Sequence, residues 1–212
     1  MAVRVEKKQP KPPNQQVFNV PNLLTGSRMV LAIVLFGLLG WAQGVIASSP
    51  QLASHLYLTS MIIFIVAAAT DWVDGYWARK YGQVTTLGRI FDPFVDKFIV
   101  CGTFIYLVAS EGSHVTAWMA TVIVARELLV TALRGYVEQQ GGDFSAQMPG
   151  KLKMVLQCVA AVAALWVLTY TGETRPADWM TWTLLISLWG AIVLTLYSGV
   201  GYVFSAVRML RQ

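Results

Sequence analysis

Charged residues are scarce in this chain of 212 residues. Asp, Glu, Lys and Arg make up only 13% of it, whereas apolar residues make up 56%, and the mean hydropathy is +0.55. A soluble domain carries about 25% charged and about 45–50% apolar residues. The shortage of charge excludes a disordered chain and argues against an ordinary soluble enzyme. At about 20 residues per membrane-spanning helix, the chain is long enough for several spans, and we expect one integral membrane domain.

Cysteine and histidine are also rare, with two residues of each type. Cys101 and Cys158 lie inside apolar runs and far from any CxxC or Cys/His pattern, which argues against a zinc site and a disulfide framework. We interpret both as small buried hydrophobic residues. The net charge is +5, but the basic residues form no stripe interleaved with aromatic residues, so we expect no nucleic-acid partner.

Long apolar runs predict an all-α fold, an integral membrane bundle of six transmembrane helices. A short interfacial helix is expected to precede the first span, because Pro21-Asn22 is typical of a helix start that Asn22 or Thr25 caps. Residues rich in Gly, Pro and Ser separate the runs. The approximate bounds of the six spans are 22–43, 53–81, 87–110, 115–139, 149–171 and 178–207.

Lysine and arginine are distributed unevenly between the two sides of this expected bundle. The N-terminal arm, the second and fourth connections and the C-terminus are basic, whereas the opposite connections contain only Arg175. By the positive-inside rule, both termini are cytoplasmic in a multi-pass protein of the cytoplasmic (inner) membrane. We expect residues 1–18 to form a flexible basic tail that contacts membrane lipids, and 19–212 to form the membrane domain. A secretory signal that ends near Ala47 is the alternative for the N-terminal region.

Four aspartates fall inside the second and third spans, where charged side chains are costly and mark function by default. Asp71 and Asp74 are three residues apart, and Asp92 and Asp96 are four apart, so each pair lies on one face of its helix. If the chain reverses between the spans, the four carboxylates meet near the cytoplasmic surface. Two divalent cations, Mg²⁺ or Mn²⁺, would neutralise this cluster and serve phosphoryl chemistry. Helix capping and pairing with basic neighbours are the alternative.

The same segment contains eight fixed positions within 26 residues. This pattern resembles, without a gap or substitution, the signature of the CDP-alcohol phosphatidyltransferase family. The resemblance implies a homodimeric enzyme with six transmembrane helices that transfers a phosphatidyl group from CDP-diacylglycerol to an alcohol and releases CMP. The pattern reads Asp71-x2-Asp74-Gly75-x2-Ala78-Arg79-x8-Gly88-x3-Asp92-x3-Asp96.

The resemblance implies that the four aspartates share one metal site. Asp71, Asp74 and Asp92 hold the two metal ions. Asp96 is the catalytic general base toward the acceptor hydroxyl, and it is counted among the metal ligands. The positive field of the metals favours the ionised form that such a base needs.

The resemblance also implies a nucleotide site on the second span. Asp71, Asp74, Gly75, Ala78 and Arg79 would bind CDP-diacylglycerol. The two small residues let a nucleotide approach the helix backbone, and the guanidinium grips a pyrophosphate oxygen.

Further basic residues lie toward the cytoplasmic side of the predicted fourth and fifth spans. A neutral acceptor would not need them, whereas a phosphorylated one would. Headgroup snorkelling is the alternative for the two lysines, and a structural ion pair with Glu127 is the alternative for the first arginine. The residues that we expect to bind the acceptor phosphate are Arg126, Arg134, Lys151 and Lys153.

Three short segments resemble the bacterial phosphatidylglycerophosphate synthase branch of the family. This resemblance covers about residues 19–157 and favours glycerol 3-phosphate over inositol 1-phosphate or another alcohol as acceptor. A role of Arg28 in binding lipid phosphate is an alternative to simple helix capping in the first segment. The last span carries no distinctive motif. The segments are Pro21-Asn22-Leu23-Leu24-Thr25-x2-Arg28, Ala125-Arg126-Glu127 and Gly150-Lys151-x-Lys153.

A cation transporter and a non-catalytic membrane scaffold are two alternatives to the transferase. A cation transporter that uses the four aspartates would usually show internal pseudo-symmetry and a site at the membrane midplane. Here the acids occur in one half of the chain only and near one surface. A non-catalytic membrane scaffold leaves the acids unexplained. The transferase therefore remains the favoured interpretation.

Overall fold

The computed structural model describes the backbone of residues 20–81, 86–139, 148–170 and 175–210, and the side chains of 23–70, 91, 93–137, 152–170 and 175–204. Within these ranges the chain is all-α, without a strand, and each helix overlaps a predicted one. The helices are α1 (Val20–Val45), α2 (Pro50–Tyr81), α3 (Thr86–Val108), α4 (Ala117–Gln139), α5 (Met148–Val167) and α6 (Asp178–Leu210).

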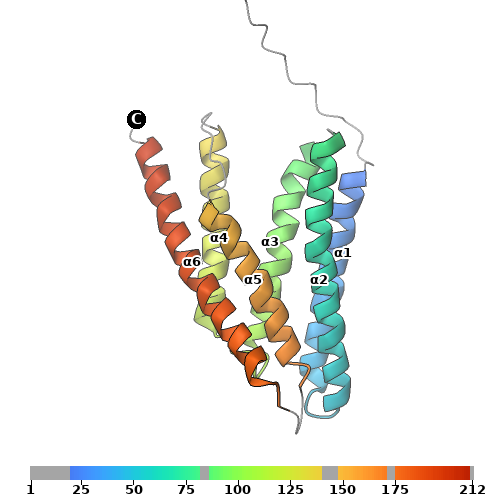
Figure 1. The fold of residues 1–212 in the computed structure, drawn as a ribbon. Coiled ribbons are helices and arrows are strands. Elements are labelled where there is room, and N and C mark those ends of the chain that lie inside the picture. Colours follow the sequence, from blue (N-terminus) through green and yellow to red (C-terminus); the bar gives the residue numbers. More distant parts are fainter. Residues whose placement is uncertain (1–19, 82–85, 140–147, 171–174, 211–212) are drawn as a thin grey trace, which may run out of the picture.

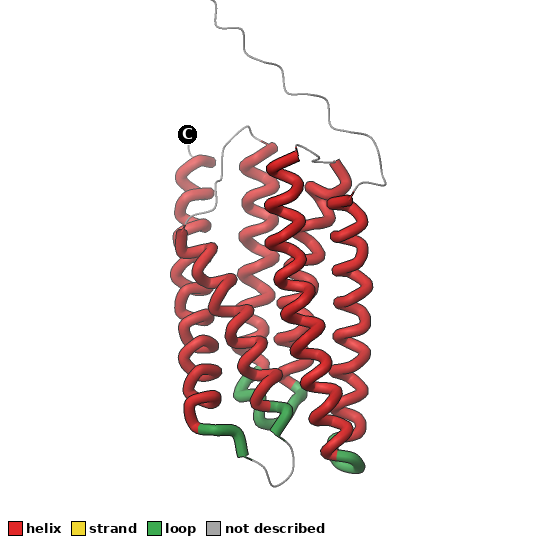
Figure 2. The backbone as a smooth tube through the Cα atoms, turned by 45° about the vertical axis from the view of Figure 1, so that its right-hand side comes forward, coloured by secondary structure: helices red, strands yellow, loops and turns green. Residues whose placement is uncertain are grey.

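The helices run alongside one another in a single bundle, and helices that follow each other in the chain are antiparallel (Figures 1 and 2). α1 packs mainly against α2, and α5 packs mainly against α6, whereas α3 contacts α1, α4 and α5. At the upper end of the bundle in Figure 1, α2, α4 and α6 end and α3 begins. This end therefore gathers segments that are far apart in the sequence.

Local sequence explains where the helices begin and end at the lower end of the bundle. The carbonyl of Val45 accepts hydrogen bonds from the backbone N–H groups of Ser48 at 3.1 Å and Ser49 at 2.8 Å, which closes α1. α2 begins at Pro50, because a first helical position needs no intrahelical N–H donor. Between α3 and α4, Gly112 has a φ angle of 86°, a conformation that glycine adopts without steric penalty.

The structure corrects the expectation of a separate interfacial helix. α1 is one continuous helix of 26 residues from Val20, so Asn22 and Thr25 lie inside it and not at a cap. Pro21 lies in the first turn, where its missing N–H removes no helical hydrogen bond, and the chain has no reason to break there. The predicted tail of residues 1–18 lies outside the described residues and stays a prediction.

Three helices are long and apolar enough to cross a membrane, within the ranges that the structure describes. They are Leu23–Val45, Pro50–Thr70 and Asp178–Phe204, and Leu152–Val167 is a shorter apolar helix. Large apolar side chains also cover the outside of the bundle, as Ile186 on α6 does with 67% exposure. An apolar exterior of this extent fits hydrocarbon and not water. The chain is a membrane protein.

Gly102 on α3 lets α1 approach closely. A Cβ atom added to Gly102 would lie 2.1 Å from Cζ of Phe36 on α1. The Phe36 ring is held between Phe98 and Tyr106 of α3, with ring centroids 5.2 Å and 5.5 Å away. The ring has little room to retreat, so Gly102 sets the spacing of the two helices.

Gly102→Ala is therefore expected to lower the midpoint of thermal unfolding in detergent. Overpacking a filled site costs about 1–3 kcal/mol, more than the helix propensity of alanine returns. The matched control is Gly37→Ala on α1, where an added Cβ meets nothing within 4 Å. A midpoint for Gly102→Ala at or above that of the parent protein would contradict the close approach.

Candidate active site

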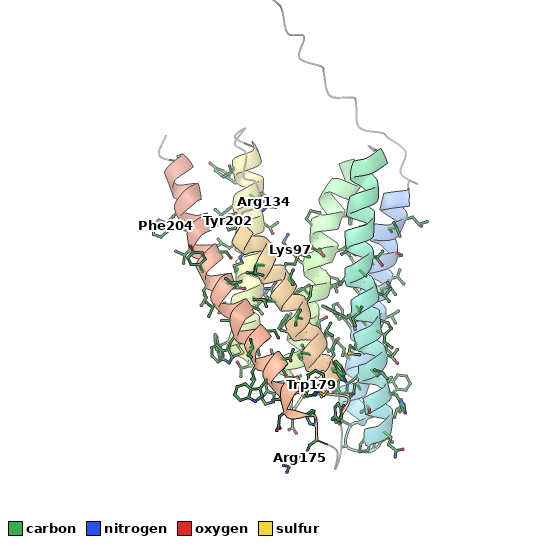
Figure 3. All side chains as sticks on the ribbon, viewed as in Figure 1. Lys97, Arg134, Arg175, Trp179, Tyr202 and Phe204 are labelled. Carbon is green, nitrogen blue, oxygen red and sulfur yellow. The ribbon has the colours of Figure 1, made fainter. Side chains whose placement is uncertain are left out.

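A cavity of about 220 Å³ opens between α3, α4, α5 and α6. Figure 3 shows Lys97, Arg134 and Tyr202 around this region in the upper half of the bundle, whereas Arg175 lies at the opposite end. The cavity is lined by Asp96, Lys97 and Val100 of α3, Arg126, Glu127, Val130, Thr131 and Arg134 of α4, Lys153, Met154 and Gln157 of α5, and Tyr202 of α6.

Cations outnumber anions in the wall of this cavity. Its lining contains four cationic side chains and two carboxylates. The structure brings together Arg126, Arg134 and Lys153, which the sequence predicted as a phosphate site, with Asp96, the predicted base. The side chain of Lys151 lies outside the described residues.

Glu127 joins two of these cations from two helices. Its carboxylate lies 3.5 Å from Nη1 of Arg126, and it also forms an ion pair with Lys153 of α5. The Lys153 side chain is only 4% exposed, so snorkelling toward headgroups is wrong for this residue. The Arg126–Glu127 pair weighed as an alternative is present, and it lies within the cavity wall. The pair and a role in the site are therefore compatible.

Two buried arginine nitrogens at the cavity have no hydrogen-bond partner among the described residues. They are Nε of Arg126 and Nε of Arg134, which lie about two turns apart on α4. A buried N–H donor without a partner is unfavourable, and native proteins rarely leave one so. Guanidinium N–H groups have the geometry that carboxylate and phosphate oxygens accept. Both arginines line the cavity, so anionic oxygens bound there are suitable acceptors for these donors.

Asp96 lies at the α3 wall of the cavity and is held from α1. Nη2 of Arg28 donates a hydrogen bond of 2.9 Å to Oδ1 of Asp96. The Arg28 side chain is buried, whereas the Asp96 side chain is 28% exposed, so the carboxylate remains accessible. From the sequence, the alternatives for the segment that contains Arg28 are simple helix capping and binding of a lipid phosphate by Arg28. Its contact with Asp96 is a finding of the structure.

The rest of the aspartate signature lies near the same end of the bundle. The last part of α2 carries Asp71 and Asp74, the first part of α3 carries Asp92, and both helix segments lie at the upper end in Figure 1. The side chains of these three residues, and those of Gly75, Ala78 and Arg79, lie outside the described residues. Among the described side chains, no three His, Cys, Asp or Glu residues gather in a way that could hold a metal ion.

Comparison with known proteins decides the family. The model of the CDP-alcohol phosphatidyltransferase family matches residues 18–197. The chain belongs to this family. It is therefore a transferase, and the predicted family, enzyme class and membrane character are confirmed.

Individual relatives in this family match over nearly their whole length. A CDP-diacylglycerol–glycerol-3-phosphate 3-phosphatidyltransferase of Bacillus subtilis is 34% identical over 191 residues, which cover 88% of this chain and 94% of the relative. An Escherichia coli protein of the same name is 33% identical over 191 residues, with 89% and 95% covered. One from Salmonella typhimurium is 32% identical over 195 residues, with the same coverage.

The residues of this phosphatidyltransferase fit the divalent cations on which the family generally depends. Asp96 presents a partly exposed carboxylate at the cavity, and the other three signature aspartates belong to the segments of α2 and α3 at the same end of the bundle. Carboxylate oxygens are the donors that hard divalent cations prefer. The donor chemistry and the placement of the helices are compatible with metal binding at this end of the bundle.

Sequence reasoning missed the contribution of α6 to the transferase cavity. Tyr202 lines it, and Ser198 accepts a hydrogen bond of 3.0 Å from Nη2 of Arg126. Thr195 contacts the cavity residue Gln157, with Nε2 of the amide 3.5 Å from the threonine Oγ1. A signal was present in the sequence. These polar residues recur at helical spacing within an otherwise apolar span, as expected of a face that points into protein.

Proposed function

We propose that this enzyme transfers the phosphatidyl group of CDP-diacylglycerol to glycerol 3-phosphate, giving phosphatidylglycerophosphate and CMP. The observation that carries the proposal is the cavity wall, where two buried arginine Nε groups have no partner among the described residues and cations exceed carboxylates by two. That surplus matches a dianionic phosphate monoester. The names of the relatives point to the same acceptor.

The acceptor is oriented by residues that different helices contribute to the cavity. Its phosphate binds Arg126, Arg134 and Lys153, with Lys151 as a further predicted contact, while the primary hydroxyl at its other end faces Asp96 on α3. Such an arrangement holds a nucleophile near its base and converts an encounter in solution into a positioned reaction. The cationic phosphate site and the Asp96 carboxylate together thus select a molecule with a phosphate at one end and a hydroxyl at the other.

Asp96 acts as the general base in the proposed transfer. It accepts the proton of the acceptor hydroxyl, while the hydroxyl oxygen bonds to the phosphorus that carries diacylglycerol. The bond from that phosphorus to the bridging oxygen of the nucleotide breaks, and CMP leaves with that oxygen. Arg28 donates a hydrogen bond to Oδ1 of Asp96 and so helps to orient this carboxylate.

The proposal assigns the donor and the metals to the signature residues. Asp71, Asp74 and Asp92, together with Asp96, would hold two divalent cations, Mg²⁺ or Mn²⁺, which supply charge stabilisation for the transferring phosphoryl group. Gly75, Ala78 and Arg79, beside Asp71 and Asp74, would bind the nucleotide of CDP-diacylglycerol. These assignments rest on the matched signature and on the placement of α2 and α3 at the cavity end.

The proposal also includes six membrane spans with a cytoplasmic active site. α3, α4 and α5 have 23, 23 and 20 residues, and helices of about 20 residues cross a bilayer. Each of these three helices contributes charged residues to the cavity, and these residues lower the mean hydropathy of the helix. The basic connections support a cytoplasmic position for this end, both termini and the 1–18 tail, in a protein of the inner membrane. Assembly as a homodimer completes the proposal.

An acceptor panel tests the proposed function. Purified protein receives CDP-diacylglycerol in mixed micelles, Mg²⁺ or Mn²⁺, and one acceptor at a time: glycerol 3-phosphate, inositol 1-phosphate, glycerol or serine. CMP release and the mass of the lipid product are measured, with a chelated reaction as control. We expect glycerol 3-phosphate to give the highest kcat/KM. Preference for another acceptor would overturn the acceptor assignment, and absence of CMP release with any of them would overturn the transfer.

A further inference from the structure

One face of α6 carries polar and small residues that line the acceptor cavity or contact residues that line it. Thr195, Ser198, Gly199 and Tyr202 are spaced by three, four and seven residues, so they share one side of the helix. Thr195, Ser198 and Tyr202 are buried, whereas Tyr197 on the other side of α6 is 69% exposed. The inward face of an apolar helix thus contains groups that can contact a charged neighbour.

Ser198 binds the end of the Arg126 side chain. Its hydroxyl donates to the carbonyl oxygen of Thr195 at 3.3 Å, which leaves its lone pairs free to accept. Nη2 of Arg126 donates to this oxygen at 3.0 Å. Nη1 is at the same time engaged by Glu127 at 3.5 Å. The two terminal nitrogens of the guanidinium are therefore held from two helices.

Gly199 makes room for the aliphatic part of the same arginine. A Cβ atom added there would lie 3.3 Å from Cγ of Arg126, closer than side chains normally pack. The stem of Arg126 therefore passes directly over the backbone of α6. A larger residue at this position would push the arginine away from the helix.

The ring of Tyr202 contacts the guanidinium of Arg126. The guanidinium carbon of Arg126 lies 5.4 Å from the ring centroid, within the range of a cation–π interaction. Figure 3 shows Tyr202 on α6 in the upper half of the bundle, and the residue lines the cavity itself. Both terminal nitrogens of the guanidinium and its flat face thus have partners, whereas its Nε has no partner among the described residues.

We propose that Ser198, Gly199 and Tyr202 form an α6 seat that fixes Arg126 at the cavity wall and thereby sets the affinity for the acceptor phosphate. A long side chain that must be ordered on binding weakens affinity, and an arginine that is already ordered avoids this loss. The three α6 residues are positioning residues that act through Arg126. The inference rests on the proposed function and extends it to a helix without a signature motif.

Steady-state kinetics with glycerol 3-phosphate varied at saturating CDP-diacylglycerol tests the seat. Tyr202→Leu is expected to raise the KM for glycerol 3-phosphate about three- to thirtyfold, the range from an exposed to a desolvated cation–π interaction, with kcat and the KM for CDP-diacylglycerol nearly unchanged. Ser198→Ala should raise the same KM. Tyr202→Phe keeps the ring face and should recover most of the affinity lost in Tyr202→Leu. The matched control, Tyr197→Leu on the exposed face, should change neither constant.

A double-mutant cycle tests whether Tyr202 acts through Arg126. Arg126→Ala is expected to raise the KM for glycerol 3-phosphate far more than that for CDP-diacylglycerol. In the Arg126→Ala background, Tyr202→Leu should add no further increase, because the group that it positions is gone. Equal fold-changes in both backgrounds would show that Tyr202 acts independently and would overturn the seat.

Failure of the seat can be told from failure of the proposed function. If Arg126→Ala raises the KM for glycerol 3-phosphate but Tyr202→Leu and Ser198→Ala do not, the seat is wrong and the function stands. If Arg126→Ala leaves that KM unchanged, the proposed phosphate site is wrong, and the seat falls with it. A rise in both KM values together with a lower unfolding midpoint would assign the α6 residues a structural role only.

Discussion

Replacing Asp71, Asp74 or Asp92 with asparagine is expected to abolish most of the turnover. Each change removes one negative charge and one oxygen ligand from the proposed two-metal site. Loss of groups that merely orient metal ligands already costs about 10–100-fold, so loss of a ligand should lower kcat at least about 100-fold. CMP release at saturating and at limiting Mg²⁺ measures the effect, and binding of Mn²⁺ followed by electron paramagnetic resonance gives a readout independent of turnover.

The control for these variants is Asp178→Asn. Asp178 is exposed and lies in the first turn of α6, at the opposite end of the bundle from the cavity. This variant should bind Mn²⁺ and release CMP as the parent protein does, and all variants should insert into membranes and purify as dimers. Near-normal turnover of Asp71→Asn, Asp74→Asn and Asp92→Asn at limiting Mg²⁺ would end the two-metal proposal.

Asp96→Asn is expected to lower turnover while the donor still binds. Removal of a general base costs about 10²–10⁴-fold in rate. The asparagine side chain can still accept the hydrogen bond from Arg28, so the geometry between α1 and α3 is largely kept. Binding of CDP-diacylglycerol should stay within a few-fold, and rapid-quench measurement of the first turnover should show a slowed transfer step.

The Asp96→Asn experiment distinguishes two roles of the carboxylate. If donor binding is lost together with Mn²⁺ binding, Asp96 is chiefly a metal ligand and not the base. The substitution also leaves the buried Arg28 guanidinium facing a neutral group, which destabilises a protein interior. The unfolding midpoint is therefore measured in parallel, and the rate loss counts as catalytic when it is present well below that midpoint.

The six helices were predictable because the helices of a membrane protein correspond to long apolar runs in its sequence. Each run must supply its own backbone hydrogen bonds in a bilayer, so its length and its Gly, Pro and Ser boundaries are local properties. α2 begins at Pro50, three residues before the predicted start, and α5 ends at Val167, four residues before the predicted end. The prediction of a separate interfacial helix was wrong, because Pro21 is tolerated in the first turn of a helix and nothing interrupts α1.

Residues of the cavity were predictable where charge falls in a helix that should be apolar. Such charge needs a partner or a function, which drew attention to the four aspartates and to Arg126, Arg134 and Lys153. The described side chains among them, Asp96, Arg126, Arg134 and Lys153, do line one cavity. Helical spacing alone was sufficient to group residues on the same helix face.

By itself, the sequence determined the six-helix all-α fold, the family and the residue types of the site, because hydropathy runs and a motif within one stretch are local features. Only the tertiary structure decided which distant residues form ion pairs: Arg28 with Asp96, and Glu127 with Lys153. It also decided that Lys153 points inward and that α6 holds Arg126. These pairings depend on the rotation and spacing of neighbouring helices, which follow from side-chain packing across the bundle. Helical spacing in the sequence indicates which face of α6 points inward, but not which residue that face contacts.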